Sequence, residues 1–525
     1  MLERLKEVRG TKIESYAEIS IFEGFPQFFY DVSPVKLSPG EEQLCNALKS
    51  IIMGTKSIDE TRSQYPKIFS KQFMDALKEK IITSITYSGA LTNLLEPAEF
   101  EALKVALIAL FKEFLPAAKN VAALANKILD YTIGYGFLSP LIRDQNLEEI
   151  MINGYNKPIF VFHKTFGMCK TNLLVTNEAA LNTLIQRIAN TANKRFGLER
   201  PLLDARLVGG NRANATYPLV TPFGPTLTIR KFTRIPLSII DLIANNTMTS
   251  ELAAFLWVMV EGLNIEPMNI IITGGTGSGK TTTLNVLSSF IRYQDRIVTI
   301  EDTLELHLGS RENWIQMESK LKGKDTEEVT MDDLLRNALR MRPDRIIVGE
   351  VRGPEAQTLF VAMDTGHQGC LGTLHSNSSK EMLLRLRADP MGVPRAMIPL
   401  LDLIIVQYRM YVKGRGILRR ISQVAEVTSM EGKPLLSNIF EWHRENDVVE
   451  RTKVPSHVIE MLAQKTTKTK TEIKRETNVR RKILEWMLNN GIRSTPEVET
   501  VIQRYYYNPE SLLEKVAVDL EKETK

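Results

Sequence analysis

Gly274-Gly-Thr-Gly-Ser-Gly-Lys-Thr281 follows the apolar run Ile270-Ile-Ile272 and precedes a helix-compatible stretch, residues 282–290. A strand, a glycine-rich loop and a helix in this order form a cradle for phosphate groups. Successive backbone N–H groups turn inward around a phosphate in conformations that a Cβ atom would obstruct, which is why the loop needs glycine. The stretch therefore predicts a site for a nucleoside triphosphate.

The last residues of this loop match the chemistry of a bound triphosphate. Lys280 can reach the β- and γ-phosphates as a point charge, and Thr281 can offer its hydroxyl to Mg²⁺. The helix that begins here directs its positive end toward the anion. The predicted nucleotide-binding residues of the loop are Gly274, Gly275, Thr276, Gly277, Ser278, Gly279, Lys280, Thr281 and Thr282.

Length and composition place the chain among soluble globular proteins. Its 525 residues exceed what one compact core accommodates, and 43% hydrophobic with 25% charged residues excludes a disordered or fibrous class. The longest uncharged apolar runs, residues 105–111 and 252–260, are far shorter than the roughly 20 residues that cross a bilayer. Because the first residues lack an apolar signal core, we expect a cytoplasmic protein.

Charge and cysteine content narrow the possible partners. A net charge of +5 is the difference between 67 basic and 62 acidic side chains, so nucleic acid is not the expected main partner. Cys45, Cys169 and Cys370 are too far apart for a CxxC pair, so we expect neither structural zinc nor a disulfide framework.

Hydrophobic periodicity predicts four parts. Residues 1–140 read as a helical bundle, with Pro97 suited to the first position of one helix. Residues 141–235 read as a mixed α/β domain ending in a linker near residues 233–236, because short apolar runs flank the Asn153-Gly154 turn. Residues 236–448 alternate strands and helices as a parallel sheet requires, and residues 449–525 are helical again. The fold class is therefore α/β, with helical parts at both ends.

Acidic residues and a histidine follow the expected strands of residues 296–300, 345–349 and 370–374. Ligands of parallel sheets bind beyond the carboxyl ends of the strands. Glu350 is therefore the candidate that polarises an attacking water, and a neutral His375 could hydrogen-bond a γ-phosphate. Glu301, Asp302 and Glu305 are predicted to hold Mg²⁺, partly through water, because Mg²⁺ keeps much of its hydration shell.

Further positive charge must come from elsewhere, since the loop supplies only Lys280. The mixed domain offers Arg206, Arg212 and Arg230, with Lys231 and Arg234 close by. Arginine suits phosphate groups because its planar guanidinium is always charged. We therefore predict that this domain closes over the nucleotide, with Arg212 and Arg230 acting in catalysis and Arg206 in binding.

Four ordered motifs resemble those of the secretion ATPase superfamily, which drives type II and type IV secretion, type IV pili and the archaeal flagellum. They are the phosphate loop, the acidic box of residues 299–305, the block of residues 339–352 and the block of residues 365–376. The resemblance extends upstream to residues 134–144, 148–154 and 203–212, and so covers roughly residues 130–430.

The resemblance implies a RecA-like ATPase domain in residues 236–448, capped by a PAS-like α/β domain in residues 141–235. It also implies a homo-hexameric ring that binds ATP and Mg²⁺ at the inner face of the cell membrane, together with a polytopic membrane platform protein and accessory motor proteins. The four zinc-binding cysteines of the bacterial type II branch are missing, and Gly349-Glu350 lacks a following aspartate, which leaves Mg²⁺ coordination open. The chain looks most like the archaellum motor ATPases, and archaeal type IV pilus assembly or secretion ATPases are the alternative.

Two other classes of function stay open at this point. Residues 465–482 hold eight basic residues against two glutamates, as a DNA translocase would require, although Ile483, Trp486 and Met487 continue this segment as an amphipathic helix. A nucleotide-gated scaffold without hydrolysis is the other, and Glu350 and His375 argue against it. We favour the ring motor.

Overall fold

The computed structural model describes residues 2–4, 10–33, 36–64, 69–87, 94–116, 118–207, 209–231, 236–309, 311–320, 327–412, 415–430 and 432–523. It divides the chain into two compact units, Met1–Thr233 and Arg234–Lys525. Apart from Pro236, the linker predicted near residues 233–236 lies outside the described residues. Within the described ranges, every helix is too short or too polar to cross a membrane.

The first unit is built on a largely antiparallel sheet with the strand order β2-β3-β4-β7-β6-β5-β10-β9-β8, and β1 pairs with β7. One pairing, between β4 and β7, is parallel. The strands are β1 (Leu2–Arg4), β2 (Thr11–Tyr16), β3 (Ile19–Glu23), β4 (Phe28–Val32), β5 (Leu147–Ile152), β6 (Pro158–His163), β7 (Gly167–Val175), β8 (Leu202–Arg206), β9 (Arg212–Thr216) and β10 (Thr226–Arg230).

The prediction that residues 1–140 are helical throughout is wrong at the beginning of the chain. Residues 11–32 form β2, β3 and β4, which extend the sheet of the α/β part. Ile19 and Ile21, like Tyr30 and Val32, are buried and alternate with less buried neighbours. This period of two is typical of a strand with one buried face, and it decides the conformation here.

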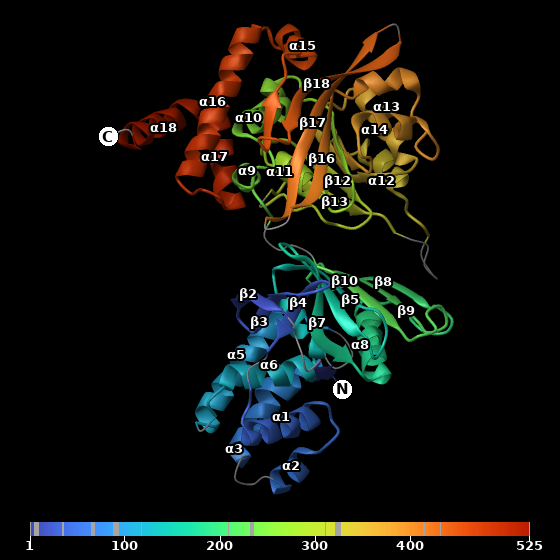
Figure 1. Cartoon of the computed structure of the whole chain (residues 1–525), viewed down its shortest axis with the longest axis vertical. Coiled ribbons are helices and arrows are strands. Elements are labelled where there is room, and N and C mark those ends of the chain that lie inside the picture. The colour runs from blue at the N-terminus through green and yellow to red at the C-terminus, as the bar shows by residue number, and fades with distance from the viewer. Residues whose placement is uncertain are drawn as a thin grey trace. The chain divides into compact units, whose positions relative to one another are not determined.

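Helices α1, α3, α5 and α6 enclose an apolar core of their own, and α8 covers the sheet. Pro97 begins α5, as predicted. Figure 1 shows α1, α2, α3, α5 and α6 gathered to one side of the strands of this unit. The helical segments are α1 (Pro39–Ile52), α2 (Ile58–Gln64), α3 (Lys71–Leu77), the π-helix η1 (Lys78–Ile82), α4 (Thr83–Tyr87), α5 (Pro97–Phe114), α6 (Val121–Thr132), the 3₁₀-helix η2 (Gly136–Leu138), α7 (Ser139–Arg143) and α8 (Glu178–Thr191).

The second unit contains the predicted parallel sheet, in the strand order β13-β12-β14-β15-β11-β16-β17-β18-β19. In this spatial order, β13, β12, β14, β15, β11 and β16 run parallel to one another. The remaining strands, β17, β18 and β19, each pair antiparallel with the strand before them. This confirms the α/β class with a RecA-like sheet. The strands are β11 (Ile270–Gly274), β12 (Ile297–Glu301), β13 (Trp314–Glu318), β14 (Arg345–Val351), β15 (Leu371–Leu374), β16 (Leu403–Val412), β17 (Gly416–Met430), β18 (Lys433–His443) and β19 (Val448–Arg451).

Helices cover both faces of this sheet. Ile270 and Ile272 of β11 point into one apolar core, and Ile271 points into the other. The segments are α9 (Ile239–Ala244), α10 (Ser250–Glu261), η3 (Gly262–Asn264), α11 (Lys280–Ser288), α12 (Met331–Ala338), α13 (Glu355–Asp364), α14 (Ser379–Arg387), η4 (Arg395–Leu400), α15 (His457–Thr466), α16 (Lys470–Asn489), α17 (Thr495–Tyr507) and α18 (Pro509–Glu523). Figure 1 shows α16 and α17, in red, on one side of the sheet and α12, α13 and α14 on the other.

The amphipathic interpretation of residues 465–487 is confirmed. Ile473, Ile483, Trp486 and Met487 of α16 are buried, and α16 packs on α10. Arg480, although basic, is also buried, where it pairs with Glu261 at 2.8 Å. The apolar face of this segment therefore belongs to the protein core.

The N-terminal strands are anchored to the rest of the first unit by Asp144. Its carboxylate accepts hydrogen bonds from the hydroxyls of Tyr30 at 2.5 Å and Tyr16 at 2.8 Å. Tyr30→Phe keeps the packing and removes one bond to a charged acceptor, which contributes roughly 1.5–3 kcal/mol. We expect Cys169, buried beside β4 in the adjacent strand β7, to react with a thiol reagent at least about 10-fold faster in this variant.

The other two buried cysteines serve as internal controls in that labelling measurement. Cys45 lies in α1 and Cys370 in the second unit, so both should react at the wild-type rate. Tyr155→Phe, at an exposed tyrosine, controls for the substitution itself. An unchanged rate at Cys169 in Tyr30→Phe would show that Asp144 does not anchor β4.

Candidate functional site

The phosphate loop has the strand, loop and helix geometry that the sequence predicts. β11 ends at Gly274, where a Cβ atom would lie 2.2 Å from the carbonyl oxygen of Gln407 on β16. Gly277 and Gly279 have φ angles of +70° and +96°, which residues with a Cβ atom rarely adopt. Gly279 caps α11, which begins at Lys280. The glycines are therefore required by backbone conformation and by close approach.

Lys280 is buried and held within the loop. Its ammonium donates to the carbonyl oxygens of Gly274 at 3.0 Å and Gly275 at 3.1 Å. It also lies 3.3 Å from Nδ1 and 3.4 Å from Nε2 of His375, which follows β15. The ammonium thus connects the loop to the end of a neighbouring strand.

His375 in turn contacts Glu350 of β14, with 3.3 Å between Nε2 and Oε1. Burial and the nearby Lys280 ammonium lower the pKa of His375 below its usual value, and Glu350 opposes this shift. A neutral ring suits both contacts, because Nδ1 can accept from Lys280 while the Nε2–H group donates to Glu350. The structure therefore brings together three residues predicted to act in catalysis, Lys280, Glu350 and His375.

Glu301, at the end of β12, stabilises a turn. Its Oε2 atom accepts from the backbone N–H groups of Glu305 at 2.7 Å and Leu306 at 2.9 Å. Burial raises the pKa of this carboxyl group to about 7. Its second oxygen, Oε1, is buried without a hydrogen-bond partner, so it is the part of Glu301 that could accept from a metal-bound water.

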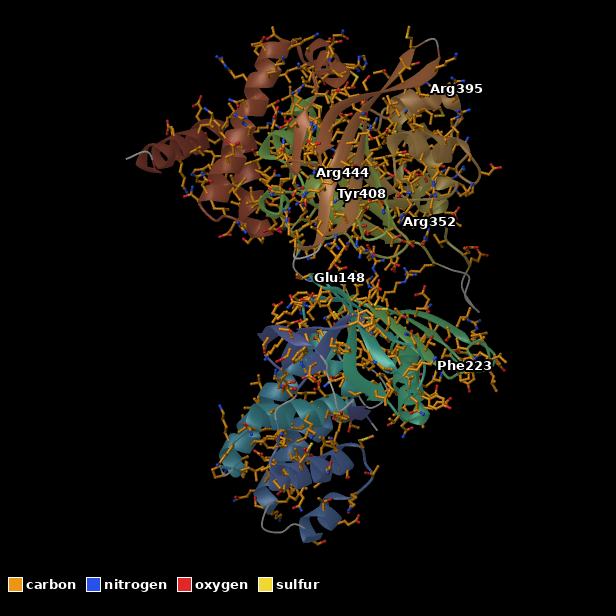
Figure 2. The ribbon with its side chains drawn as sticks, viewed as in Figure 1. Glu148, Phe223, Arg352, Arg395, Tyr408 and Arg444 are labelled. Atoms are coloured by element: carbon orange, nitrogen blue, oxygen red, sulfur yellow. The ribbon has the colours of Figure 1, made fainter. Side chains whose placement is uncertain are left out.

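Asp302 forms an ion pair with Arg352. Its carboxylate accepts from the guanidinium of Arg352 at 2.6 Å, a residue to which sequence reasoning assigned no role. Arg352, labelled in Figure 2, follows β14, and its backbone N–H donates to Glu355 at 2.7 Å. Within the described ranges, no three His, Cys, Asp or Glu side chains gather closely enough to hold a metal ion. Glu301, Asp302 and Glu305 therefore do not form such a group among the described residues.

Three further residues contact the phosphate loop and were missed by sequence reasoning. They are Gln407 and Arg409 of β16 and Arg419 of β17. Gln407 accepts a hydrogen bond from Thr283 of α11 at 2.9 Å, and Arg419 donates to the carbonyl of Gly277 at 3.0 Å. In the sequence, the signal that could have found these residues was the polar pair Gln407 and Arg409 directly after the apolar run of residues 403–406.

The predicted arginines of the first unit form a row. Arg206 pairs in register with Arg212, and Arg212 pairs with Arg230, across β8, β9 and β10. Directly paired residues of antiparallel strands share a face, so all three lie on the face opposite the apolar core. Arg212 also binds Asp204 through two hydrogen bonds, of 3.0 and 2.6 Å, and this contact lowers the pKa of Asp204.

The structure describes only one of the two basic residues predicted beside this row, Lys231 and Arg234. Lys231 donates to the backbone carbonyl of Leu141 at 3.1 Å, which is a structural contact. Arg234 lies outside the described residues.

Comparison with known proteins gives consistent matches. The family described as Type II/IV secretion system protein matches residues 134–500. Uncharacterized protein MJ0781 of Methanocaldococcus jannaschii is 52% identical over 239 residues, 45% of this chain and 33% of that protein. Uncharacterized protein MJ0900 of the same organism is 36% identical over 382 residues, covering 71% of this chain and 68% of that protein. Putative conjugal transfer protein MT3759 of Mycobacterium tuberculosis is 30% identical over 319 residues, covering 59% of this chain and 88% of that protein.

The raised pKa of Glu301 predicts a pH-dependent stability of the second unit. Between about pH 4.5 and 7 the folded state binds this proton and the unfolded state releases it, so the free energy of unfolding falls as pH rises. Glu301→Gln mimics the neutral carboxyl group and does not titrate. The variant should match wild type near pH 5 and exceed its free energy of unfolding by up to about 3 kcal/mol at pH 8.

Tryptophan fluorescence during urea unfolding measures this difference, because Trp257, Trp314, Trp442 and Trp486, the four tryptophans of the chain, all lie in the second unit. Glu312→Gln, at an exposed glutamate, is the matched control. A difference between Glu301→Gln and wild type that stays constant from pH 5 to pH 8 would contradict the raised pKa.

Proposed function

Because the chain belongs to the type II/IV secretion system protein family, we propose that it is an ATPase motor that hydrolyses ATP to move its own domains. The observation that carries the proposal is the convergence of Lys280, His375 and Glu350 at the phosphate loop. Three parallel strands, β11, β15 and β14, bring these side chains together at their carboxyl ends, which is where ligands of such sheets bind.

Hydrolysis needs positioning and charge more than covalent chemistry. Lys280 binds the β- and γ-phosphates, and the N–H groups at the start of α11 surround the anion. Glu350 polarises the attacking water. His375, in contact with both Lys280 and Glu350, exchanges hydrogen-bond partners when a γ-phosphate arrives or leaves, which lets the site report the state of the nucleotide.

A bound Mg²⁺ ion would offset the negative charge of the phosphate groups. The Thr281 hydroxyl and the unpartnered Oε1 atom of Glu301 are the groups that fit it, the latter through a water molecule. Asp302 fits less well, because its carboxylate is paired with Arg352. Glu305 lies in the turn that Glu301 stabilises, and we propose that it also holds Mg²⁺ through water.

The finer assignment is a homo-hexameric ring at the inner face of the cell membrane that drives assembly or rotation of the archaellum. Its proposed partners are a polytopic membrane platform protein and accessory motor proteins. The missing zinc-binding cysteines and the sequence Arg352-Gly-Pro-Glu355, which look most like the archaellum motor ATPases, support this assignment. Pull-down of a polytopic membrane protein with the full chain, followed by its identification, tests it.

Pilus assembly or secretion is the second candidate function. The similarity to a relative named a putative conjugal transfer protein favours it. Capture of a secretion-channel component in place of a filament platform in the same pull-down would support this candidate over the first.

Two variants test the hydrolytic site. Lys280→Ala and Glu350→Gln should each lower the rate of phosphate release from Mg·ATP by about 100-fold or more, the loss expected when a group that stabilises the transition state is removed. Lys433→Ala and Glu445→Gln, at exposed positions of the same unit, are matched controls and should keep wild-type rates. Unchanged hydrolysis by pure Lys280→Ala protein would refute the assignment.

The arginine row has its own test. We propose that Arg212 and Arg230 act on the charge that develops during hydrolysis, with Arg206 assisting ATP binding. Arg212→Ala and Arg230→Ala should then lower kcat for ATP hydrolysis more than they weaken ATP binding measured by calorimetry. Arg200→Ala, at an exposed arginine of the first unit, should change neither quantity. Equal losses of turnover and affinity would count against a catalytic role.

A further inference from the structure

Side chains of the late strands β16 and β17 lie against the phosphate loop. Arg419 donates through Nε to the carbonyl oxygen of Gly277 at 3.0 Å. The space that a Cβ atom would take at Gly277 lies 2.6 Å from a guanidinium nitrogen of Arg409. At Gly279 the same space lies 3.0 Å from the amide nitrogen of Gln407 and 3.3 Å from Cδ of Arg419. These side chains therefore fill the positions that the glycines leave open.

The strands themselves aim these residues at the loop. The pairing of β16 with β17 shifts register between Val406 and Gln407, and such irregularities redirect side chains near functional sites. Beyond the shift, Arg409 pairs directly with Arg419, so the two guanidinium groups share one face. Like charges in this arrangement destabilise a sheet unless acceptors or anions offset them. The carbonyl of Gly277 is one such acceptor.

Two donors of the loop region converge on one carbonyl oxygen. The carbonyl of Gly275 accepts from the Lys280 ammonium at 3.1 Å and from the backbone N–H of Ser278 at 3.3 Å. A phosphate oxygen would accept from the same donors. The N–H of Ser278 and the carbonyl of Gly277 belong to one planar peptide unit and point in opposite directions. The bond from Arg419 to the carbonyl therefore keeps the N–H directed toward the oxygen that Lys280 also contacts.

We propose that Arg419 is a positioning residue for nucleotide binding, which orients the peptide between Gly277 and Ser278 so that its N–H group faces the phosphates. Arg409 adds positive charge to the same side of the loop. This inference rests on the proposed function for its effect on ATP, whereas its effect on the loop itself is independent of hydrolysis.

Two measurements on the full chain test the proposal. The first is the equilibrium binding and steady-state hydrolysis of Mg·ATP by wild type, Arg419→Ala and Arg419→Lys. Arg419→Ala should raise Kd and KM by about 10-fold, the change expected when a hydrogen bond from a charged group is lost, while kcat stays within about 2-fold. Arg419→Lys, which keeps a charged donor, should restore part of the affinity.

The second measurement is amide hydrogen exchange of residues 275–280 without nucleotide. A positioning role predicts faster exchange in Arg419→Ala than in wild type. The matched control is Arg444→Ala. Figure 2 labels Arg444 and Tyr408, and the Arg444 guanidinium lies 5.7 Å from the ring centre of Tyr408 and 5.4 Å from that of Trp442. This control should keep wild-type binding and exchange.

The outcomes separate this proposal from the proposed function. Wild-type exchange of the loop in Arg419→Ala overturns the positioning role, as does wild-type affinity in a protein that hydrolyses ATP. A loss of kcat with unchanged Kd also overturns it, because the arginine would then act in catalysis. Absence of hydrolysis in wild type, with Lys280→Ala indistinguishable from it, overturns the proposed function while the exchange result still decides the role of Arg419.

Discussion

A buried ammonium group sets the geometry of the candidate site. Lys280 cannot lie within the protein at low cost unless acceptors surround it, and the carbonyls of Gly274 and Gly275 provide two of them. The third contact, His375, comes from β15, so β15 must lie beside β11. Glu350 then follows from the next strand, β14, through its contact with His375. One charged side chain thus connects the loop, the strand order and the two residues that we propose to act in catalysis.

The helix that carries Lys280 is also fixed at its far end. The guanidinium of Arg311 donates to the backbone carbonyl of Ser288, the last residue of α11, at 3.4 Å and to that of Arg292, in the turn after it, at 2.9 Å. Gln503 and Tyr506 of α17 donate to Ile291 at 2.9 Å and to Phe290 at 2.7 Å. The C-terminal helices are therefore part of the core of the second unit, and movement of α11 would reach them directly.

The phosphate loop and the ends of three strands could be predicted from the sequence, because glycine spacing and apolar runs are patterns of a few neighbouring residues. The sequence also placed Glu350 and His375 beside Lys280, since parallel strands present their carboxyl ends at one edge. It could not supply Arg409 and Arg419, whose position beside the loop depends on β16 pairing with β11 more than a hundred residues away. Nor could it show that Glu301 turns inward to backbone N–H groups, or that residues 11–32 join a sheet formed mostly by residues 147–230.

A structure of the chain bound to Mg²⁺ and a non-hydrolysable ATP analogue would decide whether a triphosphate occupies this cradle. The account predicts the β- and γ-phosphates within hydrogen-bonding distance of the Lys280 ammonium, with the carbonyl of Gly275 released and His375 and Glu350 facing the γ-phosphate. A nucleotide bound away from residues 274–281, or phosphates in the loop with Glu350 and His375 turned away from them, would contradict it.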